Sequence, residues 1–242
     1  MPPKSETSRP KASGTDTPRP KRYYRSNPRI PRGADRLVPE VRLPVTEEQI
    51  ERWVEELFLG GSRNADCGMK AMVGYVILKY GAWEQAMNAG MSSEAKTAFR
   101  ATWALEWAYE YAGPDGLPPW LFDRMVSDFA ASTNGSLHRV YAKMLCDRMR
   151  FGGVRPDDAQ AGMLAEKCFD LVIDPTVKTS VRFWCLEILS ELAPRIDWVA
   201  EELPAIVMRI SEAPDCPPGM RVVTRGILGR AGTPAAANLA TH

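Results

Sequence analysis

The sequence predicts an all-α protein that forms a short α-solenoid, a stack of helical hairpins, behind a disordered N-terminal arm. Apolar residues recur at helical spacing from about residue 46 to about residue 230. No stretch alternates apolar and polar residues, as a strand would, for more than a few positions. One helix pattern also recurs at intervals of roughly 40 residues, which indicates a helical-repeat protein.

Charge and proline content divide the 242-residue chain into an arm and a body. Residues 1–42 hold eleven Lys or Arg and four acidic residues, a net charge of +7, whereas the other 200 residues hold 20 basic and 26 acidic residues, a net charge of −6. Nine of the 20 prolines fall within residues 1–44. Such a segment buries too little apolar surface to offset its ordering entropy, so we expect a disordered basic arm over 1–44. The helical-repeat domain is expected over 45–230, and a disordered tail over 231–242.

Cysteine usage and hydropathy bear on the compartment. The five cysteines include no C-x-x-C pair, and several stand at apolar helix positions, so we interpret them as small buried hydrophobic residues in a reducing compartment. The chain start lacks the apolar stretch of a signal peptide, and no apolar run reaches the roughly 18 residues of a membrane span. We therefore expect a cytoplasmic protein with no metal or cofactor.

Capping residues, prolines and glycine pairs indicate where the predicted helices begin and end. A capping box at Thr46 and Gln49 opens the first helix, whose apolar residues follow the spacing of one helix face. A helix near Asp197–Ser211 is expected to bend or restart at Pro204, because proline has no backbone N–H to donate. The other predicted starts and stops are Gly60-Gly61, Ser92-Ser93, Gly113 to Gly116, Pro118-Pro119, Ser136, Pro156, Asp174-Pro175 and Pro217-Pro218.

Three predicted helices align without gaps: Ser136–Leu145, Ser180–Leu189 and Gly219–Leu228. Each begins with a small residue followed by an apolar one, has a basic residue at the third or fourth place, and ends on an apolar pair. The offsets are 44 and 39 residues, and a fainter copy lies around Thr97–Leu105. This period is typical of HEAT-type arrays; the alternative is a non-repetitive helical bundle with helices of similar length.

Four segments resemble motifs of a family of small bacterial HEAT-like proteins, found chiefly in Bacteroidetes. Phe99–Glu106 resembles the family's R-A-A-W-x-L-E helix, and Leu137–Leu145 resembles its V-x-R…K-I-L helix. Cys168–Val181 is similar to its C-F-x-L…P-V-A-V-K stretch, and Gly219–Leu228 to its G-F-x-S-R-x-R-x-I-L end. The resemblance covers about residues 46–230 and implies a HEAT-repeat fold with no settled activity. The basic arm is not part of it.

Sequence motifs for the common kinds of catalysis are missing. His138 and His242 are the only histidines, and neither has the spacing of a metal site. A nucleophile elbow, a P-loop and a dinucleotide-binding loop are also absent from the sequence. We therefore expect a non-enzymatic scaffold that binds a protein partner through its helical-repeat surface.

One helix suggests an enzyme as an alternative. Trp103, Glu106 and Trp107 share a helix face, and HEAT-like DNA glycosylases use aromatic rings beside a carboxylate for base chemistry. The simpler interpretation is that both tryptophans are core residues. Glu106 would then pair with Arg100 or with an arginine of a neighbouring repeat.

Four basic residues are the predicted contacts of the partner. Arg139 and Lys143 share a helix face at i and i+4, and Arg182 and Arg221 hold nearly equivalent places in later repeats. On a concave surface they would form a ladder suited to an acidic peptide or phosphate groups. Alternatively the ladder pairs internally. The acids available for that are Asp147 in the same helix and, in adjacent repeats, Asp157, Asp170 and Asp174.

The arm contains a cluster of basic and aromatic residues, Lys21, Arg22, Tyr23, Tyr24 and Arg25. Such a cluster suits single-stranded nucleic acid, through phosphate contacts and base stacking, so a nucleic-acid-associated protein is a further alternative. It equally suits an acidic protein surface, or solubility alone. The net charge of −6 on the body opposes duplex DNA binding by the body itself.

Overall fold

The structure, a computed structural model, describes residues 43–59, 66–113 and 116–231. Within these residues there are ten α-helices and no β-strand, so the all-α prediction is confirmed. The helices are α2 (Glu47–Leu59), α3 (Asp66–Tyr80), α4 (Trp83–Gly90), α5 (Ala95–Ala112), α6 (Leu121–Ala131), α7 (Gly135–Arg150), α8 (Asp158–Ile173), α9 (Thr179–Leu192), α10 (Asp197–Glu212) and α11 (Pro218–Ala231).

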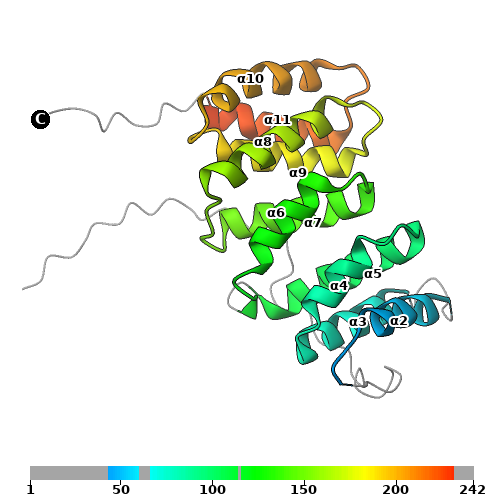
Figure 1. Cartoon of the computed structure of the whole chain (residues 1–242). Helices are drawn as coiled ribbons and strands as arrows, with labels where there is room; N and C mark the ends of the chain where they lie inside the picture. The colour runs from blue at the N-terminus through cyan, green and yellow to red at the C-terminus, as the bar shows by residue number, and fades with distance from the viewer. Residues whose placement is uncertain (1–42, 60–65, 114–115, 232–242) are drawn as a thin grey trace, which may run out of the picture.

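The helices lie in two layers and follow one another in chain order, from α2 at one end to α11 at the other (Figure 1). In one layer α3, α5, α7, α9 and α11 each pack on the next, and we call this layer the odd-numbered row. In the other layer α2 packs on α4, and α6 packs on α8. Helices adjacent in sequence join the two layers, because α4 packs on α5, α6 on α7, α8 on α9 and α10 on α11.

The hydrophobic core extends without interruption between the layers, from Val45 to Ile227. The three aligned segments of the sequence lie in α7, α9 and α11, and the fainter copy lies in α5, so all four belong to the odd-numbered row. Their second place is occupied by Leu137, Val181 and Met220, each at most 1% exposed. The second place of the aligned segments is therefore a buried position in all three helices.

Several predicted boundaries agree with the structure. The N–H of Gln49 donates to Thr46 Oγ1 (3.3 Å) at the start of α2. Gly113 follows α5 with a φ of 64°, a conformation that glycine adopts without a side-chain clash. Pro218 is the first residue of α11, a position at which a backbone N–H would have no acceptor within the helix. Helices α6 and α8 each begin two residues after the proline predicted to open them.

Two predicted helix caps are wrong, because a neighbouring side chain reaches the first turn instead. Helix α7 is capped by Asn134 rather than Ser136, and Asn134 Oδ1 accepts the N–H of Ser136 at 2.8 Å. Helix α5 is capped by Glu94 rather than Ser92-Ser93, and the Glu94 carboxylate accepts two N–H groups of the first turn. A hydrogen bond from the Thr97 side chain, together with these two N–H bonds, lowers the pKa of Glu94 below its ordinary value.

The predicted start of α9 at Asp174-Pro175 is also wrong. Asp174 is the C-cap of α8, and its Oδ1 accepts both the N–H (2.8 Å) and the hydroxyl (2.7 Å) of Thr176. This turn delays the start of α9 to Thr179. Of the bend or restart predicted at Pro204, the restart is wrong, because one continuous helix, α10, runs through this proline.

Some predictions fall on parts of the chain that the structure does not describe. The arm expected over 1–44 lies outside the described residues, apart from residues 43 and 44. The same holds for the helix stop at Gly60-Gly61 and for the tail expected over 231–242, apart from residue 231.

Among the glycines that the structure describes, Gly74 makes the closest contact with another helix, where α3 crosses α5. A Cβ atom placed on Gly74 would lie 2.6 Å from Trp107 Cβ and 2.8 Å from both Ala104 O and Ala108 N. Only a residue without a side chain allows the two helix backbones to approach this closely.

We predict that Gly74→Ala destabilises the protein by about 1–3 kcal/mol, because the added methyl group meets backbone atoms that cannot move aside. The matched control is Gly162→Ala in α8, where the new Cβ has no neighbour within 4 Å. That substitution is expected to stabilise the helix by about 0.5–1 kcal/mol. Urea unfolding followed by circular dichroism measures both, and equal effects of the two substitutions would contradict the close crossing.

Candidate partner-binding site

Two of the predicted contact residues, Arg139 and Lys143 of α7, are bound to acidic side chains of α5. Glu106 is only 6% exposed, and its carboxylate accepts from Arg139 Nη2 (3.1 Å) and Lys143 Nζ (2.5 Å). Lys143 Nζ also lies 3.1 Å from Glu110 Oε1, and the Arg139 guanidinium lies over the Trp103 ring at 5.9 Å. The carboxylate considered for base chemistry is therefore held by two cations of the neighbouring helix α7, one of them the arginine Arg139.

Asp147, expected to pair with Lys143 inside α7, takes part in a different bond. Its Oδ2 accepts the hydroxyl of Tyr109 at 2.6 Å, and both side chains are buried. One helical turn separates Asp147 from Lys143, so both still face α5, where the Tyr109 phenol reaches the carboxylate. A bond between helices thus replaces the predicted bond within one helix.

The same kind of pairing continues along the odd-numbered row. Arg150 of α7 contacts Glu187 (2.5 Å) and Glu191 (2.6 Å) of α9. Arg230 of α11 contacts Glu187 at 3.3 Å and donates to Ser190 Oγ at 3.1 Å. Glu187 is only 2% exposed, so these cations offset the cost of burying its charge. Charged side chains therefore join α5 to α7, α7 to α9, and α9 to α11.

The four predicted contacts do not form one ladder, because their places in the repeat differ. Arg139 stands at the fourth place of its segment, whereas Arg182 and Arg221 stand at the third. Successive side chains of an α-helix differ in direction by about 100°, so Arg139 points in a different direction from Arg182 and Arg221. The true equivalent of Arg182 in α7 is His138.

His138 and Arg182 make the same kind of contact in successive helices of the odd-numbered row, which the sequence pattern did not reveal. His138 Nε2 lies 2.8 Å from the carbonyl oxygen of Ser132, the residue that ends α6. Arg182 Nε donates to the carbonyl of Val172 (3.0 Å), near the end of α8. Carbonyls at helix ends lack intrahelical donors, so each of these side chains fixes the preceding helix. Arg221, at the equivalent place in α11, is exposed.

A pocket of about 510 Å³ lies where the α8–α9 turn faces the α10–α11 turn, and we call it the C-terminal pocket. Its charged lining residues are Arg182, Arg209 and Asp215. Its volume is within the ~300–1,000 Å³ typical of small-ligand sites. Its main apolar lining residues are Val172, Ile173, Val177, Ile210 and Met220.

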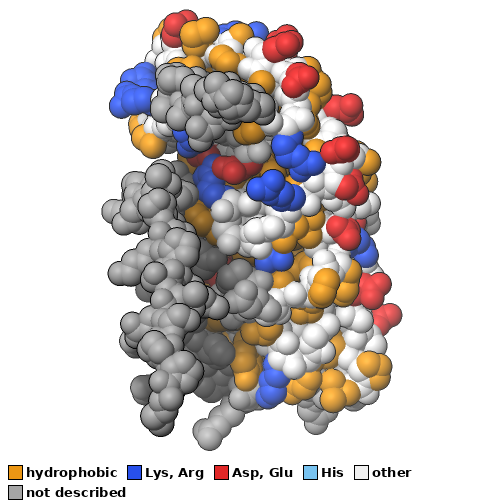
Figure 2. All heavy atoms as spheres, turned by 90° about the vertical axis from the view of Figure 1, so that its left-hand side faces the viewer, with side chains coloured by type: hydrophobic (Ala, Val, Ile, Leu, Met, Phe, Trp, Pro, Cys, Tyr) orange, Lys and Arg blue, Asp and Glu red, His pale blue; other side chains and the backbone are white. Residues whose placement is uncertain are grey.

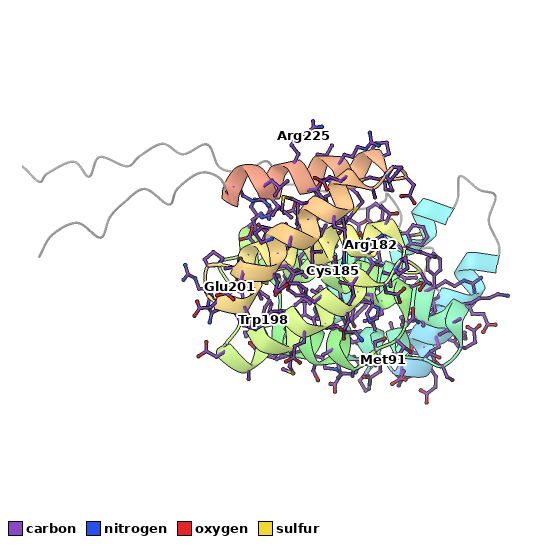
Figure 3. All side chains as sticks on the ribbon, turned by 90° about the horizontal axis from the view of Figure 1, so that it is seen from above. Met91, Arg182, Cys185, Trp198, Glu201 and Arg225 are labelled. Carbon is purple, nitrogen blue, oxygen red and sulfur yellow. The ribbon has the colours of Figure 1, made fainter. Side chains whose placement is uncertain are left out.

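Charge is unevenly distributed over the surface. On the face shown in Figure 2, Asp and Glu side chains follow one edge along the stack, whereas Lys and Arg gather in its upper part. Figure 3, viewed from the α10–α11 end, places Arg225 on the outer side of α11, away from Trp198 and Glu201 of α10. Arg225 is exposed and is not a lining residue of the C-terminal pocket. It therefore provides a matched control for arginines that are.

The cysteines whose side chains are described lie in the core. Cys146, Cys168, Cys185 and Cys216 are buried and unpaired, and Figure 3 places Cys185 in the interior. Burial raises the pKa of Cys146 and of Cys168 above their ordinary values, so both remain thiols near neutral pH. The prediction of buried cysteines is confirmed for these four.

The remaining sequence predictions concern metals, membranes and the arm. Among the residues that the structure describes, no three His, Cys, Asp or Glu side chains gather as metal ligands. In the same part of the chain, no helix combines the length and apolar character needed to cross a membrane. The cluster Lys21, Arg22, Tyr23, Tyr24 and Arg25 lies outside the described residues, and its nucleic-acid role stays a prediction.

Comparison with known proteins gives no further assignment: no protein-family model, curated protein or solved structure matches this chain.

We predict that Glu106→Gln destabilises the protein by about 2 kcal/mol, because it leaves the Arg139 and Lys143 cations without their shared buried carboxylate. The control is Glu191→Gln, at a side chain that is 30% exposed, for which we expect a loss below about 1 kcal/mol. Urea midpoints at pH 7 compare the two. A smaller loss for Glu106→Gln than for Glu191→Gln would contradict the proposed contribution to packing.

We predict that His138 makes stability depend on pH. Burial lowers its pKa below the ordinary 6.5, and nearby Lys167 acts in the same direction. The folded state therefore favours the neutral ring, so its contribution is complete above pH 6.5 and is lost as pH falls through the lower, folded-state pKa. Between pH 7 and pH 5, unfolding free energy should fall more for the wild type than for His138→Gln. Identical pH profiles in urea titrations would refute this.

Proposed function

We propose that this chain is a HEAT-type α-solenoid of the small bacterial family that it resembles, and that it acts as a non-enzymatic scaffold for a protein partner in the cytoplasm. We assign the partner contact to the C-terminal pocket, with Arg182 and Arg209 as the residues that bind acidic groups of the partner. Arg221, exposed beside the lining residue Met220, extends this contact.

The order of helix packing supports the solenoid part of the proposal. The aligned segments occupy consecutive members of the odd-numbered row, and each is preceded in the chain by a helix of the other layer that packs on it. Repeated helical hairpins stacked in this way are the architecture of HEAT arrays, which commonly present extended binding surfaces.

The single observation that carries the binding role is the pocket with two arginines on a body of net negative charge. Arg209 is exposed and makes no ion pair with another described residue. By contrast, Arg139 and Lys143 of the original four-residue ladder are bound to Glu106, so we assign them to packing between α5 and α7 rather than to the partner. Exposed arginines beside apolar residues are common anchors of protein interfaces.

The test is co-purification of the tagged full-length chain from its native host after brief cross-linking, followed by mass spectrometry. We predict that a specific protein is recovered with the wild type and with the control Arg225→Glu. Arg209→Glu should weaken the binding of that protein about tenfold, a loss of ~1.4 kcal/mol, and so lower its recovery. Recovery that Arg209→Glu leaves unchanged removes the assignment of the pocket. Finding no protein above a tag-only control removes the scaffold role.

A further inference from the structure

The chemistry of the C-terminal pocket indicates what kind of partner segment it accepts, an inference that rests on the proposed function. We propose that the pocket recognises a short peptide segment in which an acidic side chain stands beside an apolar one. The acidic group pairs with Arg209 and Arg182, and the apolar group packs against the ends of α8 and α10.

The two arginines present donors that the fold does not use. Arg182 donates through Nε to the Val172 carbonyl, and no described residue accepts a hydrogen bond from its Nη groups. Arg209 is exposed on the last turn of α10. A guanidinium offers donors in a planar fork that matches a carboxylate, so two of them at one pocket favour an acidic ligand.

The acidic residues around the pocket do not cancel its preference for an acidic ligand. Among the lining residues, Arg182 and Arg209 face one acid, Asp215, which gives the lining a net charge of +1 against −6 for the body of the chain. Asp174 lies nearby, but its carboxylate accepts two hydrogen bonds from Thr176 within its own turn. Those bonds, more than the charge of Arg182, lower its pKa below the ordinary value.

The N-terminus of α9 adds to the attraction for an acidic group. Thr179, its first residue, lines the pocket, and the N-cap residue Lys178 makes no side-chain capping bond. The first-turn N–H groups and the helix dipole there favour a negative charge, alongside the two guanidinium groups.

Apolar side chains make up much of the remaining lining. Val172, Ile173 and Val177 come from the end of α8 and the turn after it, and Ile210 and Met220 come from α10 and α11. Ile173 is 52% exposed, so a ligand that covers it removes apolar surface from water. Val172 and Met220 are buried, so the apolar surface open to a ligand is that of Ile173, Val177 and Ile210. A free inorganic anion makes no use of these three residues, whereas a peptide with an apolar side chain does.

A smaller pocket at the opposite edge of the stack contains an arginine whose guanidinium is hydrogen-bonded within the fold, in contrast to Arg209. That pocket, of about 220 Å³, is lined by Arg195, Pro156 and Glu191 among others. Arg195 donates to the Pro156 carbonyl (2.7 Å) and to Asp158 (3.0 Å), so its guanidinium joins two turns. Arg209 has no such bond within the described residues.

Charge also argues against the chain's own arm as the occupant. Residues 1–42 carry a net charge of +7, so the arm as a whole is repelled by a pocket lined with two arginines. The occupant of matching charge is an acidic segment of another protein.

The experiment uses the full chain and three fluorescein-labelled hexapeptides, measured by fluorescence anisotropy at about 0.15 M salt, where distant charges are screened. The first peptide alternates Leu and Asp, the second Leu and Asn, and the third Ser and Asp. We expect the Leu/Asp peptide to bind at least about tenfold more tightly than either of the others. Equal binding of the Leu/Asn peptide, or of the Ser/Asp peptide, would overturn the inference.

Variants locate the binding. Arg209→Glu should weaken binding of the Leu/Asp peptide about tenfold or more, whereas Arg209→Lys should retain part of the affinity. The affinity of the control Arg225→Glu should remain within about twofold of that of the wild type. Thermal unfolding verifies that each variant is folded. The inference would also be overturned if Arg209→Glu bound the peptide as tightly as the wild type does. The same holds if millimolar inorganic phosphate displaced the labelled peptide as effectively as free Leu/Asp peptide does.

The inference and the proposed function can fail separately. If no acidic peptide binds but Arg209→Glu still abolishes co-purification of a protein, then the pocket is the contact and the ligand class is wrong. If the Leu/Asp peptide binds through Arg209 but no protein is recovered from the host, then the recognition chemistry holds and the scaffold role fails.

Discussion

The packing of α3, α5, α7, α9 and α11 in one continuous row is the constraint on which the other features of this protein depend. Each inner helix of the row has a neighbour on both sides, so any charged side chain on a contact face loses water and needs a partner. Glu106 meets this requirement with Arg139 and Lys143. Glu187 of α9, further along the same row, meets it with Arg150 and Arg230, which belong to the helices on its two sides. The helix packing that buries these two acids therefore also brings the cations that neutralise them from the neighbouring helices.

The turns between the two layers obey a related rule. A helix that ends against its successor leaves carbonyl groups without intrahelical donors, and a side chain of the next helix supplies one. His138 does this for Ser132, and Arg182 does it for Val172. Arg221 holds the equivalent place in α11, the last helix of the described residues, and is exposed. Arg221 and the pocket residue Arg209 are thus both accessible at this end of the stack, beside the pocket that we propose as the contact site.

Parts of this arrangement could be predicted because they depend on residues close together in the chain. Helix content, the alignment of the segments in α7, α9 and α11, and the burial of Leu137, Val181 and Met220 all follow from apolar periodicity. The residues at which helices start were harder to predict, because several nearby side chains can cap the same helix. Asn134 lies two residues before Ser136, and both are good capping residues, so only the backbone path decides between them.

The candidate site was predicted less well, because it depends on contacts between distant residues. Arg139 and Arg182 have similar places in the repeat, yet a shift of one residue turns one toward Glu106 and the other toward Val172. Arg209 has no marker in the sequence that separates it from Arg225, since both are exposed arginines of the last two helices. What distinguishes Arg209 is its place at the pocket between two turns, and the residues of those turns are some 40 positions apart.

By itself, the sequence determined that this protein is helical, which of its segments align with one another, and that a basic N-terminal segment precedes an acidic remainder, because these properties depend on composition and on local periodicity. Only the tertiary structure decided which cations pair within the fold and which remain available. That decision depends on the direction of each side chain once α5, α7, α9 and α11 are packed, and on which helix has a neighbour to cover it.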